Sequence, residues 1–201
     1  SPQCPFCPGN EAQTPAATYT VERNGKWVVR AVPNKFAALQ KDISFQPKRV
    51  GRFLKATGYG IAEVIIETPL HNLTLATMDD KSVEDVVKVY KLRYLSVAQE
   101  KQICFINIFQ NHGVRAGTSL EHPHSQLIAT PVIPPHVRNP IEQAVRYYDT
   151  HGQCIYCVML LEEVRRQERL IAETDFFIAY APYASRTPFE VRIMPKKHQP
   201  S

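Results

Sequence analysis

Two histidines separated by one residue, His122 and His124, follow a short turn rich in glycine and hydroxyl groups. This turn, Gly117-Thr118-Ser119, offers backbone N–H groups and two hydroxyls, which are the donors that a phosphate needs. A histidine beside such a turn can attack phosphorus through its neutral nitrogen and form a phosphoramidate. The other ring nitrogen must then meet an acceptor that fixes the tautomer. The pattern indicates nucleophilic catalysis at His124, and a chance His-x-His on a polar strand is the alternative.

Four of the five cysteines form two Cys-x-x-Cys pairs, Cys4/Cys7 and Cys154/Cys157. In a cytosolic chain such pairs more often bind metal or perform catalysis than form disulfides. Redox pairs of the thioredoxin kind sit at a helix N-terminus, which stabilises the thiolate. Because Pro8-Gly9 follows the first pair and suits a tight turn, we favour metal binding there over redox chemistry or a purely structural role.

The two cysteine pairs begin two stretches of similar sequence. Each pair is followed at a similar interval by a proline, and further on by a Glu-Val strand that leads to a histidine eight residues later. Three ordered matches indicate an internal duplication. We expect residues 1–145 to form one complete repeat and residues 146–201 to begin a second. The matching positions are Cys4/Cys154, Cys7/Cys157, Pro33/Pro182, Glu63/Glu190 and His71/His198.

The duplication selects the histidines that accompany the cysteines. Structural zinc takes four ligands, typically two cysteines and two histidines. A lone histidine is usually an ordinary core or surface residue, but His71 and His198 occupy equivalent positions. We therefore predict a first metal site with Cys4, Cys7, His71 and His122, and part of a second with Cys154, Cys157 and His198. The remaining cysteine, Cys104, lies in an apolar run and is expected to be a small buried hydrophobic residue.

Composition narrows the class of protein. The chain of 201 residues is 44% hydrophobic and 21% charged, which is typical of a soluble globular protein. Its apolar runs fall short of the roughly 20 residues that span a bilayer, and the start lacks the features of a signal peptide. We therefore expect a cytoplasmic protein without a membrane partner. The net charge of +5 comes from scattered residues, which favours a small phosphorylated substrate over nucleic acid.

Periodicity predicts both helices and strands. Apolar residues at helical spacing predict helices over residues 79–100 and 155–169. Short runs rich in β-branched residues predict strands over residues 27–32, 63–67, 103–109 and 126–133. In an extended strand His122, His124 and Gln126 would face the same side. Strands in meander order with inserted helices predict an α+β fold, an antiparallel sheet with flanking helices.

The motif His122-Pro-His-Ser-Gln126, with Asn111 upstream and a Cys-x-x-Cys pair near the start, resembles the galactose-1-phosphate uridylyltransferase family of the histidine-triad superfamily. The resemblance extends from Cys4 to the end of the chain. It implies a histidine-triad-like fold in two repeats, bound zinc and a homodimer. It also implies a ping-pong reaction in which His124 takes a uridylyl group from UDP-glucose and a sugar 1-phosphate, such as galactose 1-phosphate, accepts it.

The same resemblance implies roles for further residues. Gln126 would contact the nucleotidyl phosphate, Thr118 and Ser119 would bind phosphate, and Asn111 would contact the nucleotide. The wall around base and ribose would be formed by Phe6, Asn34, Phe36 and Val64. Cys4, Cys7, His71 and His122 match the zinc ligands of the family.

Two departures from the familiar uridylyltransferases bear on the nucleotide. Lys35 stands where those enzymes carry an acidic residue near the ribose, and Ser125 stands where they more often have glycine or cysteine. The serine form also occurs in relatives that transfer adenylyl groups, such as the ADP-glucose phosphorylases. Adenylyl transfer is therefore the first alternative. A histidine-triad nucleotide hydrolase and a non-catalytic zinc-binding module are the others.

Overall fold

A computed structural model describes residues 3–199 of the chain. These residues divide into two compact units, Ser1–Ile133 and Pro134–Ser201, which are described separately. The boundary expected at residue 145 falls inside a helix that belongs entirely to the second unit. Within the described part of the chain, helices are too short or too polar to cross a membrane.

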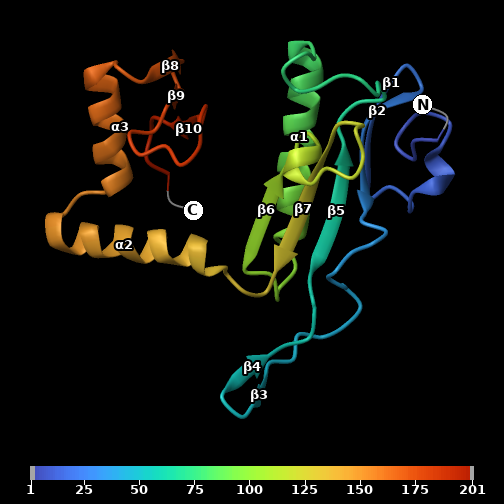
Figure 1. The fold of residues 1–201 in the computed structure, drawn as a ribbon, viewed down its shortest axis with the longest axis horizontal. Helices are drawn as coiled ribbons and strands as arrows, with labels where there is room; N and C mark the ends of the chain where they lie inside the picture. The colour runs from blue at the N-terminus through green and yellow to red at the C-terminus, as the bar shows by residue number, and fades with distance from the viewer. Residues whose placement is uncertain (1–2, 200–201) are drawn as a thin grey trace. The chain divides into compact units, whose positions relative to one another are not determined.

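The first unit is built on a five-stranded antiparallel sheet in the order β1-β2-β5-β7-β6 (Figure 1). Its strands are β1 (Tyr19–Arg23), β2 (Lys26–Pro33), β5 (Ile61–Ile66), β6 (Phe105–Phe109) and β7 (His124–Thr130). The four strands predicted from sequence correspond to β2, β5, β6 and β7, with ends that agree to within three residues. The α+β fold with an antiparallel sheet is confirmed.

Helix α1 (Asp80–Val97) covers one face of this sheet (Figure 1). Asp79 caps it: the Asp79 carboxylate accepts a hydrogen bond of 2.7 Å from the backbone N–H of Ser82. The buried helix residues Val86 and Val89 pack in one core with sheet residues such as Ile65. The helix therefore lies where residues 79–100 predict it, two or three residues shorter at its C-terminal end.

The opposite face of the sheet carries the N-terminal segment. Phe6 packs there with Val32, Val64 and Ile66, together with the two cysteines of the first pair. Because side chains alternate along a strand, the residues on this face are not those that pack against α1. In β7 the buried residues Ser125, Leu127 and Ala129 alternate with the half-buried His124, Gln126 and Ile128.

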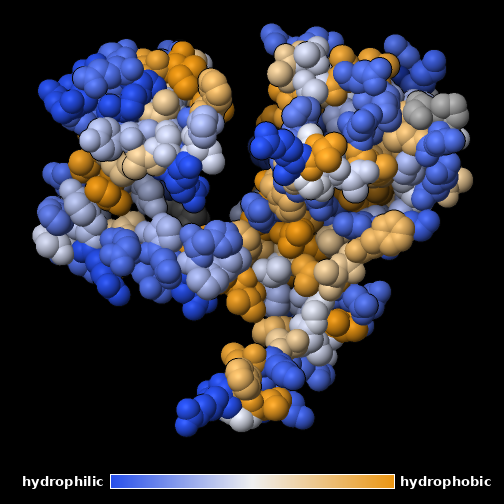
Figure 2. Space-filling view, viewed as in Figure 1, coloured by the Kyte–Doolittle hydropathy of each residue, from blue (hydrophilic) through white to orange (hydrophobic). Residues whose placement is uncertain are grey.

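Between β2 and β5 the chain makes a two-stranded hairpin, β3 (Lys48–Val50) and β4 (Phe53–Lys55). Its residues are exposed, and Figure 2 shows hydrophobic and hydrophilic side chains together on this hairpin; the hydrophilic ones in its strands are Lys48, Arg49 and Lys55. Two short 3₁₀ turns, η1 (Glu11–Gln13) and η2 (Val114–Ala116), complete the unit. The hairpin was not predicted from sequence, because its short strands bury no face and so lack an alternating pattern.

Cys104 corrects the sequence interpretation. It is exposed, although it was expected to be buried. The strand that follows begins only at Phe105, so Cys104 lies in the connection that leads into β6. The residues that follow it in the apolar run belong to β6, whereas Cys104 itself lies outside the strand.

The second unit contains helices α2 (Pro135–His151) and α3 (Ile155–Arg166) and a three-stranded antiparallel sheet in the order β10-β9-β8. Helix α2 was not predicted: Pro134-Pro135 directly follows the strand predicted over residues 126–133, and two consecutive prolines suit the end of a strand. A proline is well tolerated at the first position of a helix, where its missing N–H is not needed. The strands are β8 (Leu170–Glu173), β9 (Phe177–Tyr180) and β10 (Arg192–Pro195).

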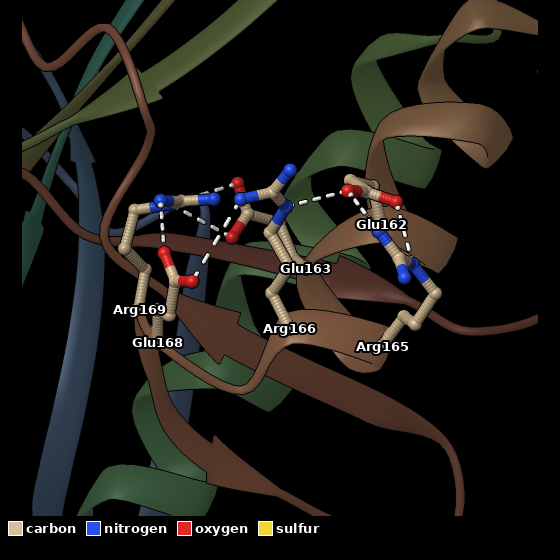
Figure 3. A network of polar contacts seen from close by, with 6 residues as sticks. All are labelled: Glu162, Glu163, Arg165, Arg166, Glu168 and Arg169. Carbon is tan, nitrogen blue, oxygen red and sulfur yellow. Dashed lines mark hydrogen bonds and ion pairs between the residues drawn. The ribbon is translucent and has the colours of Figure 1, made fainter.

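Ion pairs fix the connection from α3 to β8 (Figure 3). Arg169 donates a hydrogen bond of 2.9 Å to Glu163, whose side chain is buried. The exposed Arg165 and Arg166 both contact Glu162 and lower the pKa of its carboxyl to about 2. The helix ends at Gln167, which adopts a left-handed conformation.

The register of the strands supports the duplication. In the first unit Ala31 pairs with Ile65, and in the second unit Tyr180 pairs with Arg192. Aligning the two halves by their prolines and Glu-Val strands places Ala31 with Tyr180 and Ile65 with Arg192. Strand pairing is therefore the same in both units, and β8-β9-β10 corresponds to β1-β2-β5.

The fold predicts that Ile65 is a main contributor to the stability of the first unit. Its side chain is fully buried between the central strand and α1. Replacing it with alanine leaves a cavity, so Ile65→Ala should lower the free energy of unfolding by about 2–5 kcal/mol. The exposed Leu54 is the control, and Leu54→Ala should cost less than about 0.5 kcal/mol. Denaturant unfolding measures both, and equal losses would contradict this description of the core.

Candidate active site and metal centre

The structure brings together the four residues predicted for the first metal site. One ligand atom from each of Cys4, Cys7, His71 and His122 lies within 4.8 Å of the others. The Cys7 sulfur is 3.4 Å from Nδ1 of His71 and 3.6 Å from Nδ1 of His122, and these two nitrogens are 3.3 Å apart. A tetrahedral zinc ion would require about 3.6 Å between sulfur and nitrogen and about 3.3 Å between nitrogens. The donor set and its spacing therefore fit a tetrahedral metal ion.

His122 is held so that its metal-facing nitrogen can be unprotonated. Its Nε2 lies 2.8 Å from the carbonyl oxygen of Thr68, which can only accept, so Nε2 carries the proton and Nδ1 faces the cluster. The ring is fully buried, and burial is the main cause that lowers the pKa of His122. A neutral imidazole is the form that binds metal.

The two cysteines lie in a compact turn. The backbone N–H of Cys7 donates to the carbonyl of Cys4, and the Asn10 side chain donates to the same carbonyl at 2.8 Å. Burial raises the pKa of the Cys4 thiol. A cation beside the sulfur would favour the thiolate and oppose this effect of burial. The turn thus presents both sulfurs in the manner of a metal-binding knuckle.

Cys154, Cys157 and His198 also converge, within the second unit. The Cys157 sulfur is 3.1 Å from Nδ1 of His198. Cys154 is the N-cap of α3. The pKa of the Cys154 thiol is lowered, chiefly by a hydrogen bond from the backbone N–H of Cys157. This group has three members among residues 3–199 and is more exposed than the first.

His124 adjoins the first cluster and differs from His122 in its contacts. Its Nδ1 lies 2.7 Å from the backbone carbonyl of His122, so Nδ1 carries the proton. Within the described residues Nε2 makes no hydrogen bond. The Phe6 ring meets the rings of both histidines edge-on, with centroids 5.3 Å from His124 and 6.0 Å from His122. His122 precedes the first residue of β7, which is why the two rings face different surroundings although strand alternation predicted a common side.

A cavity of about 610 Å³ opens in front of His124. Six other residues predicted for the site line it, together with eight further residues. The side-chain oxygen of Asn34 accepts a hydrogen bond from the backbone N–H of Phe36. In this turn Phe36 is 87% exposed. The predicted lining residues are Phe6, Asn34, Phe36, Val64, Ser119 and Gln126. Among the others are Pro5, Gln13, Thr14, Lys35 and Leu120.

Asn111 and Thr118 are not among the residues that line this cavity. They line a smaller neighbouring cavity of about 150 Å³, which His122 and His124 also line. The Thr118 hydroxyl donates at 2.7 Å to the carbonyl of Asn111 and so closes the loop that joins β6 to β7. Gly117, in a left-handed conformation with φ of 79°, allows the chain to turn at the end of η2. Of the two hydroxyl-bearing residues of the turn, Thr118 and Ser119, Ser119 is the one that lines the larger cavity.

Several residues that shape the site carried no signal in the sequence. The carbonyl of Thr68 is a backbone group, so its residue type does not reveal it. Thr14 and Pro15 reach the cavity from a segment without regular structure. Ser125 lies within the recognisable motif, but its side chain turns away from the cavity and toward Glu67.

Fold and site together define an α+β protein of the histidine-triad-like class, with an antiparallel sheet whose His-Pro-His-Ser-Gln strand adjoins a Cys₂His₂ cluster. The sequence profile of the galactose-1-phosphate uridyl transferase N-terminal domain matches residues 1–134. The chain belongs to the galactose-1-phosphate uridylyltransferase family, as its motifs predicted.

Relatives of two activities are similar to this chain. It is 34% identical to the ADP-glucose phosphorylase of Arabidopsis thaliana over 97% of its length, and 31% identical to the galactose-1-phosphate uridylyltransferase of Thermotoga maritima over 98%. It spans 55% and 58% of those proteins, a little over half. The crystal structure of an Arabidopsis thaliana ADP-glucose phosphorylase with bound ADP-glucose superposes with a TM-score of 0.84, at 30% identity, over 98% of this chain and 60% of that one.

The cluster geometry predicts metal-dependent stability. Cys7→Ser should remove about one equivalent of bound metal and lower the melting temperature, because one of four ligands is lost. The exposed Cys104 is the control, and Cys104→Ser should retain both metal and stability. Elemental analysis and thermal unfolding before and after chelation measure the two effects. An unchanged metal content in Cys7→Ser would contradict the ligand assignment.

Proposed function

We propose that this protein is a nucleotidyltransferase in which His124 is the nucleophile. One observation carries the proposal: His124 lines the cavity of about 610 Å³, and its Nδ1 donates a hydrogen bond to the carbonyl of His122. With the proton on Nδ1, the lone pair of Nε2 is available to attack phosphorus. Membership of the family and the similarity to two nucleotide-sugar enzymes support the same reaction.

The proposed reaction has two displacement steps. In the first, Nε2 attacks the α-phosphorus of a nucleoside diphosphate sugar, the N–P bond forms, and the bond from the α-phosphorus to the bridging oxygen breaks. Sugar 1-phosphate leaves with that electron pair. In the second, a phosphate oxygen of another sugar 1-phosphate attacks the same phosphorus, and the N–P bond breaks. The Nδ1 proton stays on the ring throughout, where the His122 carbonyl supports the positive charge.

Neighbouring residues would assist in different ways. Gln126 lines the same cavity two residues further along β7, and its amide can donate to the oxygens of the α-phosphate. Ser119 lines the same cavity and can donate to phosphate, while Phe6, Phe36 and Val64 offer apolar surface to the nucleoside. We assign Asn34 to the wall around base and ribose, Asn111 to a contact with the nucleotide, and Thr118, with Ser119, to binding phosphate.

Zinc is the proposed metal at both Cys/His groups. Cys4, Cys7, His71 and His122 would hold it in a closed four-ligand site, and Cys154, Cys157 and His198 would contribute to a second. Bound zinc would supply structural rigidity, since a site with four protein ligands leaves no position for substrate. Through His122 this rigidity extends to the carbonyl that orients His124.

We propose UDP-glucose as donor and galactose 1-phosphate as acceptor, in line with the uridylyltransferase relatives. Adenylyl transfer is the second candidate, because the ADP-glucose phosphorylase relative is similar at 34% identity and Lys35, rather than an acidic residue, lines the cavity. We further propose a cytoplasmic homodimer made of two repeats, divided near residue 145, with neither nucleic acid nor membrane as partner.

His124→Ala should abolish exchange of label between sugar 1-phosphate and nucleotide sugar, because no other nucleophile takes its place. His124→Gly should regain part of the activity when imidazole is added, since the small molecule can occupy the vacated space. Gln126→Ala should retain His124 and lose only about 10²–10³ in rate. Exchange kinetics with labelled sugar 1-phosphate measure all three. Full exchange by His124→Ala would place the nucleophile elsewhere.

Trapping the covalent intermediate should identify the base. UDP-glucose and ADP-glucose, each labelled at the α-phosphate, are supplied separately to the protein without an acceptor. The proposed function predicts that UDP-glucose labels the protein faster than ADP-glucose does. Faster labelling by ADP-glucose would establish the second candidate instead. Release of free nucleotide with no labelled protein would indicate a hydrolase.

A further inference from the structure

A buried carboxylate lies directly behind the strand that carries His124. Glu67 follows β5 and is 1% exposed, although it is an acidic residue. Buried charges are rare unless hydrogen bonds satisfy them. The carboxylate of Glu67 is contacted by three donors from three different parts of the chain: Tyr90 on α1, Gln110 after β6, and Ser125 on β7.

These contacts are short and occupy both carboxylate oxygens. One oxygen accepts from the Tyr90 hydroxyl at 2.7 Å and the Ser125 hydroxyl at 2.5 Å, and the other accepts from the Gln110 amide at 2.9 Å. The two hydroxyls are themselves 2.5 Å apart. Burial is the main cause that raises the pKa of Tyr90, which keeps its hydroxyl protonated as a donor. The group is a closed hydrogen-bond network.

The main chain of Glu67 contacts the same strand. Its N–H donates to the carbonyl of Pro123 at 3.2 Å, and its side chain accepts from Ser125. Pro123 and Ser125 are the residues on either side of His124. A single residue therefore contacts both neighbours of the proposed nucleophile: Pro123 through its main chain, and Ser125 through its side chain on the helix-facing side of the sheet.

We infer that Glu67 is a positioning residue that fixes His124 for attack on the α-phosphorus, an inference that rests on the proposed function. Displacement of a nucleophile by about 1 Å can cost about a hundredfold in rate, so anchoring both neighbours affects chemistry directly. Ser125 is then part of the motif for a physical reason, because its hydroxyl connects the nucleophile strand to the buried carboxylate. Gln110 extends the same anchor to the loop that begins at Asn111.

The fold offers a matched control for the test. Glu63, also on the helix-facing side of β5, is 4% exposed and accepts two hydrogen bonds from Arg93 of α1, at 2.7 and 2.8 Å. Like Glu67, it is a buried carboxylate that ties α1 to the sheet. Within residues 3–199 the Glu63 side chain makes no hydrogen bond or ion pair with residues 122–126, so it shares the structural role of Glu67 without the proposed positioning role.

The experiment compares Glu67→Leu with Glu63→Leu in the full, metal-loaded chain. The readout is the single-turnover rate of protein labelling by α-phosphate-labelled UDP-glucose or ADP-glucose, whichever labels the wild type. Dividing by the number of titrated active sites removes the effect of unfolded protein. We expect Glu67→Leu to slow labelling per site by about tenfold or more with little change in KM. Glu63→Leu should lose thermal stability and keep a per-site rate within about twofold of wild type.

Two further variants keep the test decisive if Glu67→Leu does not fold. Ser125→Ala removes one donor from the network and should slow labelling several-fold. Glu67→Gln should stay within about threefold of wild type, because its carbonyl still accepts from Tyr90 and Ser125 and its amide can pair with a flipped Gln110. Wild-type labelling rates in both Glu67→Leu and Ser125→Ala would overturn this inference and leave the proposed function standing. Slowing in Glu63→Leu equal to that in Glu67→Leu would do the same. Absence of labelling in the wild type with either donor would overturn the proposed function, and the inference with it.

Discussion

The arrangement of the site depends on His122, a residue with two separate tasks. Its ring belongs to the Cys₂His₂ cluster, while its carbonyl oxygen accepts a hydrogen bond of 2.7 Å from Nδ1 of His124. The ring is fixed from both ends, by the cluster at Nδ1 and by the Thr68 carbonyl at Nε2. A residue held in this way presents its carbonyl in one orientation, and this orientation sets the tautomer of the neighbouring histidine.

The alternation of β7 separates chemistry from support. His124 and Gln126 face the cavity, whereas Ser125 faces α1 together with Leu127 and Ala129. A shift of the strand by one residue would exchange these two sets, so the register against β5, in which His124 pairs with Ile66, is essential to the site. The apolar core and the Glu67 network both lie on the side of the sheet that faces α1, and both oppose such a shift.

The predictable features were those that the residue types themselves reveal. Cys-x-x-Cys pairs and equivalently spaced histidines indicated both Cys/His groups, because metal ligands are restricted to few residue types. The sheet followed from β-rich runs, and the duplication from matched positions. Helix α2 escaped prediction because a proline can begin a helix as well as end a strand. The separation of Asn111 and Thr118 from the main cavity, and the convergence of Tyr90, Gln110 and Ser125 on Glu67, depend on contacts between distant segments that no local pattern reports.

The most direct test of this account is the tautomer of His124, measured by two-dimensional nitrogen–proton NMR on ¹⁵N-histidine-labelled, metal-loaded protein. The His124 signals are assigned by their loss in His124→Gln. The account predicts a neutral ring with its proton on Nδ1 and an unprotonated Nε2, the nitrogen proposed to attack phosphorus. Chelating the metal should weaken this preference, because His122 is then held less firmly. A ring with its proton on Nε2 in the metal-loaded protein would contradict the account, since that nitrogen could not act as the nucleophile.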